Sequence, residues 1–272
     1  MSTRTRVAVV GRRFAPELLV PAALGALLVV YFAVPFVTFL SRTGTATVLD
    51  GVTSPAARVA IRNSLLTAPA STAIATVFGV PLAYVLARRS FPGKRLVEAV
   101  VLLPLIVPPV VGGAMLLTAA GRFTPLGALA AAVGVPLTDS LLGVILAQTF
   151  VAAPFVVVTA RAGFGAIDAR LEQASRSLGY GPLSTFWNVS LPLARGPIVA
   201  GIVLTFARAI GEFGATMMVA YNPRTMPTSI WVSFVAGGID EVVPLALALL
   251  AITLAVVAAV LRIGRVPTVI DR

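Results

Sequence analysis

The sequence contains no cysteine and no histidine, and only 11% of its 272 residues are charged. The missing residue types exclude thiolate nucleophiles, disulfides, most zinc sites and the usual proton shuttle at neutral pH. The shortage of charge excludes an ordinary soluble domain, in which roughly a quarter of the residues are charged. Hydrophobic residues make up 58% of the chain, and its mean hydropathy is +0.99. Lipid is therefore predicted to be the main solvent of this protein.

Acidic residues are also scarce, with 10 against 21 basic residues, and Lys94 is the only lysine. Such an excess in a soluble chain would suggest nucleic acid as a partner. In a membrane chain, basic residues instead determine which side of the bilayer each connection faces. We therefore expect membrane lipid, and no nucleic acid, among the partners.

Apolar stretches long enough to cross a bilayer predict six membrane-spanning helices, since each crossing needs about 20 apolar residues. They cover about 16–40, 63–87, 97–120, 141–160, 197–221 and 243–263. The apolar segment 125–135 is too short to cross and is expected to form a small interfacial helix, or else a re-entrant loop. No polar segment is large enough to fold alone, so the fold class is all-helical and residues 1–272 are expected to form a single membrane domain.

The positions of the basic residues predict the orientation. Fifteen of the 21 precede the first span, follow the sixth, or lie between spans two and three or four and five. The alternate connections hold five, and Arg208 lies inside the fifth span. Connections rich in arginine and lysine stay in the cytoplasm. We therefore predict a multi-pass protein of the cell (inner) membrane with both termini in the cytoplasm.

The cytoplasmic connection 161–196 is longer than two neighbouring helices require, which is typical of a functional segment. Its pattern predicts a helix, a turn at Gly179 with left-handed backbone, and a second helix that starts at Pro182. The first helix carries an apolar stripe from Ile167 to Leu178, and the second carries bulky apolar residues. This amphipathic hairpin has the form of a plug for the groove of a soluble partner. The alternative is a helix that lies on the lipid headgroups.

The hairpin resembles the cytoplasmic signature of ABC importer permeases, E-A-A-x3-G-x9-I-x-L-P. The matching positions are Gln173, Ala174, Ser175, Gly179, Val189, Leu191 and Pro192. Every spacing is kept, but Gln173, Ser175 and Val189 differ in identity from the signature. The carboxylate nearest to the signature glutamate is Glu172, one residue early.

The following stretch, 206–216, is similar to the corresponding helix of the molybdate, tungstate and sulfate permeases. The resemblance covers about 55–265 and implies a type I importer permease fold with a cytoplasmic coupling-helix hairpin. It further implies a second copy of this chain, cytoplasmic ATP-binding subunits docked under the hairpins, and an extracytoplasmic binding protein that delivers an oxyanion. The coupling positions that it implies are the seven signature residues together with Glu172.

The chain itself has no phosphate loop for ATP. Gly93 and Lys94 adjoin, but Arg95 follows where serine or threonine is needed to hold magnesium, and the upstream glycine is missing. We therefore expect a transport subunit and not an enzyme, with no cofactor in this chain. ATP and magnesium are expected on the partner subunit.

Two ionisable residues, Arg208 and Glu212, lie four residues apart inside the fifth span and hence on one helix face. A charge at the bilayer centre costs about 3 kcal/mol on insertion scales, so the two must pair or face the protein interior. One interpretation places Arg208 on the path of a dianion, with Glu212 moderating its attraction. The other is an internal ion pair that only joins helices. Three further residues are weaker candidates for the path or its gate: Thr205, Thr216 and Met217.

The sequence as a whole predicts the permease subunit of an ATP-driven oxyanion importer, with molybdate or tungstate favoured and sulfate next. A secondary transporter, in which Arg208 and Glu212 couple transport to a proton or ion gradient, is the alternative. No inverted repeat is evident in the sequence to support it. An intramembrane enzyme is a third option, but the spans carry no histidine, no cysteine and no paired carboxylates.

Overall fold

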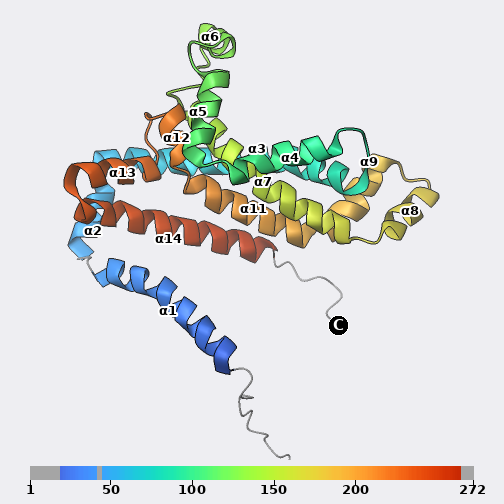
Figure 1. Ribbon diagram of the computed structural model, residues 1–272, viewed down its shortest axis with the longest axis horizontal. Helices are drawn as coiled ribbons and strands as arrows, with labels where there is room; N and C mark the ends of the chain where they lie inside the picture. Colours follow the sequence, from blue (N-terminus) through green and yellow to red (C-terminus); the bar gives the residue numbers. More distant parts are fainter. Residues whose placement is uncertain (1–18, 42–44, 265–272) are drawn as a thin grey trace, which may run out of the picture. The chain divides into compact units, whose positions relative to one another are not determined.

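The computed structural model describes residues 19–41 and 45–264, and within these ranges every regular element is helical (Figure 1). The chain divides into two compact units, residues 1–45 and 46–272. The first unit contains α1 (Leu19–Ser41), a 23-residue apolar helix with no buried residue. The predicted first span began at residue 16, and residues 16–18 lie outside the described residues, as do both termini and most of their basic residues.

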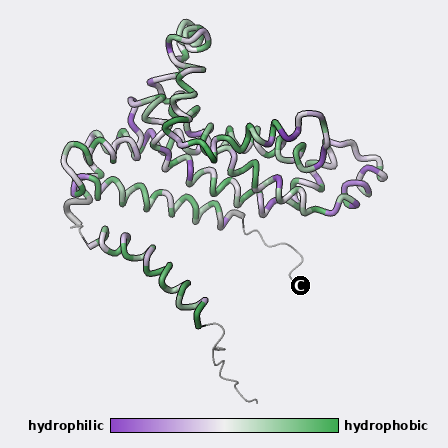
Figure 2. Tube along the Cα trace, viewed as in Figure 1, coloured by the Kyte–Doolittle hydropathy of each residue, from purple (hydrophilic) through white to green (hydrophobic). Residues whose placement is uncertain are grey.

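The second unit is a bundle of long helices with shorter helices at its ends. Its elements are α2 (Thr45–Thr53), α3 (Pro55–Arg88), α4 (Lys94–Ile106), α5 (Pro109–Ala120), α6 (Pro125–Ala132), α7 (Leu141–Ala166), α8 (Ala169–Ser177), α9 (Pro182–Thr185), the π-helical turn η2 (Phe186–Ser190), α10 (Leu191–Leu193), α11 (Arg195–Ile210), α12 (Gly214–Val219), α13 (Met226–Gly237) and α14 (Ile239–Gly264). Hydrophobic residues run along the long helices, and hydrophilic ones gather at the end that carries α8 (Figure 2).

Small residues allow the central helices to approach closely. Helix α7 contacts α3, α11 and α4, and the shared core holds Ala83, Ala160 and Phe164. A Cβ placed on Gly79 of α3 would lie 3.0 Å from the side chains of Val156 and Val157 on α7. Apolar side chains cannot drive association within lipid, so close packing of small residues is the usual means of holding such helices together.

The predicted third span, 97–120, is wrong as a single helix. Helix α4 ends at Ile106 and α5 begins at Pro109, because Val107 and Pro108 adopt extended backbone conformations. Each of these residues precedes a proline, and the proline ring disfavours helical backbone in the residue before it.

The predicted fifth span, 197–221, is also interrupted. Helix α11 ends at Ile210 and α12 begins at Gly214. The two interrupted regions meet, since a Cβ on Gly113 of α5 would lie 2.8 Å from the backbone of Ala215 in α12. The structure therefore gives Gly113 a packing role between two helices that each follow a break.

Among the described residues, four helices are long and apolar enough to cross a membrane: α1, α3, α7 and the stretch 239–260 of α14. The number rises to six if each of two bent pairs is one span, namely α5 with α6 at 68° and 182–193 with α11 at 75°. These pairs differ from the predicted third and fifth spans. The predicted short helix within 125–135 is present as α6, whereas α2 and α13 were not predicted.

Candidate functional site

The predicted helix, glycine turn and helix are present in the connection after α7. We call residues 169–193 the hairpin. The side chain of Asp168 accepts a hydrogen bond from the backbone N–H of Arg170 at 2.9 Å and caps α8. The helix ends at Ser177, and Gly179, just past its C-cap, has a φ of +88°. There the backbone N–H of Tyr180 donates to the carbonyl of Ser175 at 3.2 Å, and that of Gly179 donates to the carbonyl of Arg176 at 3.0 Å. This is the Schellman arrangement, which favours glycine because it requires positive φ.

The second limb begins at Pro182, as predicted, and winds through a π-helical turn. The N–H of Leu191 donates to the carbonyl of Phe186, five residues earlier. Pro192 follows and has no N–H of its own, so a regular helical ladder cannot continue there. The predicted connection began at 161, but α7 continues to Ala166, and the hairpin is correspondingly shorter.

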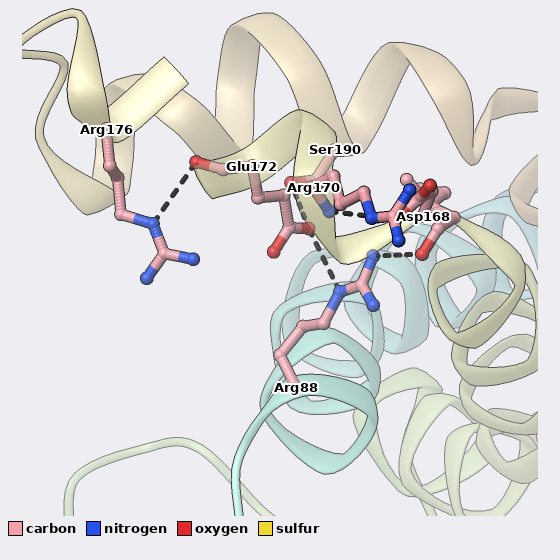
Figure 3. Close-up of polar contacts among 7 residues, drawn as sticks. Arg88, Asp168, Arg170, Glu172, Arg176 and Ser190 are labelled. Atoms are coloured by element: carbon pink, nitrogen blue, oxygen red, sulfur yellow. Dashed lines mark hydrogen bonds and ion pairs between the residues drawn. The ribbon is translucent and has the colours of Figure 1, made fainter. Parts of the chain in front are cut away.

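The inner side of the hairpin is fastened to α3 by a buried carboxylate. Glu172 is 4% exposed, and its Oε1 accepts hydrogen bonds from Arg88 Nε at 3.0 Å and from the Ser190 hydroxyl at 2.8 Å (Figure 3). Arg88 also donates to the carbonyl of Ile167 at 3.0 Å. One side chain of α3 thus binds both the end of α7 and the first helix of the hairpin, and Glu172 joins the two limbs.

Two further contacts hold the limbs in place. The hydroxyls of Ser175 and Thr185 share a hydrogen bond of 3.0 Å, and both residues are buried. Phe186 lies edge-on to Tyr84 of α3, with ring centroids 4.9 Å apart, and Tyr84 lies edge-on to Phe164 of α7 at 5.2 Å. These contacts join the hairpin to two long helices, so a force on the hairpin reaches the bundle directly.

The outer side of the hairpin is exposed and carries large apolar side chains beside polar ones such as Arg170, Gln173 and Arg176. Its exposed large apolar side chains are Leu171, Leu178, Tyr180, Leu183, Trp187 and Leu193. Among the signature positions, Gln173, Ala174, Gly179 and Pro192 are exposed, Val189 and Leu191 are partly buried, and Ser175 and Glu172 are buried. The predicted apolar stripe is therefore exposed at Leu171, Ala174 and Leu178, whereas Glu172, Ser175 and Ser190 are buried.

Arg88 and Ser190 were not among the predicted site residues. Glu172 was expected at the partner-facing surface, but it lies 84 residues from Arg88 in sequence and is buried against it. The only signal in the sequence was an acidic residue within a basic connection, which needs a cation nearby if it is buried. Several arginines could have met that need, so sequence alone could not select Arg88.

The second predicted site lies where α11 ends. Arg208 and Glu212 form an ion pair, with the Glu212 side chain fully buried and the Arg208 side chain 27% exposed. The other carboxylate oxygen of Glu212 accepts a hydrogen bond from the backbone N–H of Ala215 at 2.7 Å. Glu212 therefore binds the cation and caps the start of α12.

The other candidates around this pair differ in exposure. Thr205 and Thr216 are fully buried, and their hydroxyls make no hydrogen bond within the described part of the chain. Met217 is partly buried. Within residues 19–41 and 45–264, no three acidic side chains come close enough together to hold a metal ion.

Residues 79–267 match the model of the family described as binding-protein-dependent transport system inner membrane component. The chain belongs to this family. The match covers more than half of the chain and includes α7, the hairpin and α11 to α14. It confirms the prediction of a membrane transport subunit and not an enzyme, and it confirms the resemblance to importer permeases.

Curated relatives match almost the whole chain. A probable molybdenum ABC transporter permease protein of Haloferax volcanii is 46% identical over 244 residues, covering 90% of this chain and 89% of the relative. A molybdate/tungstate transport system permease protein of Pyrococcus abyssi is 38% identical over 237 residues, covering 86% of this chain and 90% of the relative.

Solved structures confirm the fold. A chain of a bacterial ABC transporter involved in import of the acidic polysaccharide alginate aligns with a TM-score of 0.71 at 15% identity, covering 92% of this chain and 97% of its own. A chain of the MetNI methionine ABC transporter in an inward-facing conformation aligns with a TM-score of 0.61 at 20% identity, covering 76% and 93%. The chain thus has the type I importer permease fold.

Proposed function

We propose that this chain is the membrane-spanning subunit of an ATP-driven importer that moves a tetrahedral oxyanion into the cytoplasm, molybdate or tungstate first and sulfate next. The observation that carries the proposal is the identity of 38% to 46% to molybdenum and molybdate/tungstate permeases across 86% to 90% of this chain.

The hairpin is proposed to dock a cytoplasmic ATP-binding subunit. Its exposed residues Leu178, Leu183 and Trp187 offer an apolar surface to a groove, and its buried side is fastened to α3 by Arg88 and Glu172. This combination of a free outer face and a fixed inner face suits the transfer of a domain movement into the membrane bundle. The sequence has no phosphate loop, so ATP and magnesium belong to the partner.

The proposed assembly contains two copies of this chain, an ATP-binding subunit under each hairpin, and an extracytoplasmic oxyanion-binding protein. Within it, Arg208 is proposed to lie on the translocation path, because its side chain keeps 27% of its surface exposed while its partner Glu212 is fully buried. A partly neutralised cation would attract a dianion without holding it, as passage requires.

Reconstitution tests the proposal. The full complex, assembled with its ATP-binding subunit and loaded binding protein, should take up molybdate into liposomes that contain ATP and magnesium. Uptake should survive an ionophore that collapses ion gradients and should stop when the ATP-binding subunit carries an inactivating substitution in its phosphate loop. Tungstate should compete more strongly than sulfate.

The secondary-transporter alternative predicts the opposite pattern. In that case uptake would proceed without ATP and would stop with the ionophore. Uptake that depends on a gradient alone would remove the proposed function, whatever the identity of the anion.

A further inference from the structure

A short loop between α12 and α13 is held in place by buried polar side chains of α3. The amide of Asn63 donates to the carbonyl of Arg224 at 2.8 Å, and the hydroxyl of Ser64 accepts from the backbone N–H of Met226 at 2.8 Å. Asn63 and Ser64 are 1% and 0% exposed. The loop connects to α13, which lies at the end of the bundle opposite the hairpin (Figure 1).

The loop is fixed on its other side by the start of α13. The backbone N–H of Thr225 donates to the Thr228 hydroxyl at 2.8 Å, and both threonines are fully buried. Buried polar groups cost free energy unless each finds a hydrogen-bond partner. Four such residues hold this six-residue connection in place. A connection between two helices does not by itself require buried hydrogen bonds of this kind. The loop is therefore held more firmly than its role as a connection requires.

The fixed loop presents the guanidinium of Arg224 to open space. Arg224 lies over the ring of Tyr221, 5.3 Å from its centroid, and within residues 19–41 and 45–264 its one hydrogen bond, to the Tyr221 hydroxyl, is 3.4 Å long. It lines two cavities, of about 580 Å³ and about 190 Å³. Glu241 lines the smaller one, but no ion pair joins it to Arg224 within the described part of the chain. Most of the hydrogen-bond donors of this side chain are thus unused.

The larger cavity has the composition of a weak anion site. Its lining combines Arg224 with the neutral polar residues Tyr221, Asn222 and Ser229, and with the apolar residues Pro55, Ala56 and Val59 of α3. Guanidinium presents several N–H donors in a planar fork, which suits the oxygens of an oxyanion. One cation opposite a dianion gives attraction without full neutralisation, so the anion can leave again.

We propose that Arg224 and the cavity lined by Tyr221, Asn222 and Ser229 form a binding site for a tetrahedral oxyanion on the extracytoplasmic side of the protein. The site rests on the proposed function for the identity of the anion and for its side of the membrane. It would receive the anion after release from the binding protein and before it passes Arg208.

The absence of cysteine allows a direct test. Ser229→Cys in the complete transporter, reconstituted without ATP, should react faster with an anionic methanethiosulfonate than with a cationic one. Adding Arg224→Gln should lower the ratio of the two rates about tenfold, because a unit charge near the thiol acts on the two reagents with opposite sign. Arg122→Gln is the matched control, since Arg122 lies over Phe123 in another loop and does not line the cavity. It should leave the ratio unchanged.

Tungstate alone should slow the labelling of Ser229→Cys, and this protection should disappear with Arg224→Gln but not with Arg122→Gln. Ala56→Cys on the opposite wall provides a second probe if Ser229→Cys does not assemble. An unchanged ratio, or equal protection in the Arg224→Gln variant, would overturn the site. Protection by the binding protein but not by tungstate would also overturn it, because Arg224 would then contact protein. The measurement needs no uptake, so failure of ATP-driven transport would remove the proposed function separately.

Discussion

Glu212 lies between the end of α11 and the start of the short helix α12, and its side chain makes one ion pair and one hydrogen bond there. One carboxylate oxygen pairs with Arg208, and the other accepts from the N–H of Ala215 at 2.7 Å. The pairing compensates a buried charge, and the capping bond satisfies a helix start that cannot be hydrated inside the protein. Loss of Arg208 would leave Glu212 as an unpaired buried acid, with a penalty of several kcal/mol or forced protonation.

The double substitution separates a path role from a structural role for Arg208. Arg208→Gln should reduce molybdate uptake about tenfold or more while the complex still assembles, and adding Glu212→Gln should not restore uptake because the positive charge is still missing. Glutamine at 212 keeps an oxygen that can accept from Ala215, so the double variant removes the charges and retains the cap. Uptake by the reconstituted complex, with copurification of the ATP-binding subunit as a measure of assembly, checks this result.

Recovery of near-normal uptake in the double variant would contradict the path role and leave Arg208 as a structural partner. Glu212→Ala serves as the comparison, since it removes both the charge and the cap of α12. It should lower assembly more than Glu212→Gln does. Equal assembly of the two variants would show that the bond to Ala215 contributes little.

The sequence predicted this pair because local geometry is enough to place it. Residues four apart on a helix face the same way, and a lone acid in a span needs a partner. It did not predict that Glu212 also caps α12, since the break at 211–213 depends on packing against α5. Arg224 was missed for a similar reason, because its surroundings come from α3, more than 160 residues earlier.

The hairpin combines a fixed inner face and a free outer face in a short element. Arg88, Glu172 and Ser190 join α3 to both limbs, and Phe186 adds an aromatic contact with Tyr84. The turn could be predicted because glycine and proline mark it locally. The contacts of the inner face could not be predicted, because its polar residues depend on partners from distant parts of the chain. The sequence predicted an apolar stripe offered to a partner, and its residues Leu171, Ala174 and Leu178 are exposed in the structure, while Phe186 and Leu191 pack against the core of the bundle.

The ion pair between Arg88 and Glu172 should matter for coupling between ATP hydrolysis and transport. Removal of one partner of a buried pair costs about 3 to 5 kcal/mol. Glu172→Gln should therefore loosen the hairpin and lower the number of anions imported per ATP hydrolysed severalfold, while ATP hydrolysis continues. Arg89→Gln, which removes the neighbouring charge outside this network, should leave the ratio unchanged. Parallel assays of uptake and phosphate release on the reconstituted complex check both variants.

An exchange of the two charges, Arg88→Glu with Glu172→Arg, tests whether the pair itself is responsible. Partial return of the transport ratio in the exchanged variant would support the pair. If Glu172→Gln transports at the normal ratio, the hairpin is held by its aromatic and hydroxyl contacts, and the ion pair is not needed for coupling.

The arrangement of the whole molecule depends on where its charges lie and on where its apolar helices are interrupted. Composition was enough to predict a membrane protein made of helices, whereas the orientation that the basic residues indicate stays a prediction. The interruptions of these helices were harder to predict from the sequence. The Pro108 and Pro109 break is visible in the sequence as two adjacent prolines, but its pairing with the break before α12 requires the contact between Gly113 and Ala215. Local chemistry therefore gave the helices, and long-range packing determined which of them are continuous.

Thiol labelling of single cysteines, introduced into a chain that has none, tests the arrangement of the protein across the membrane. With an impermeant reagent on intact cells, Phe123→Cys should react from outside, because the loop after α5 carries little charge and Phe123 is 88% exposed. Ser90→Cys and Leu183→Cys should react only after the membrane is opened, since both lie in arginine-rich connections. The ATP-binding subunit should then slow the labelling of Leu183→Cys, at the exposed outer side of the hairpin, but not that of Ser90→Cys. Labelling of Leu183→Cys from outside would contradict both the orientation and the docking role, because no cytoplasmic ATPase could then reach the hairpin.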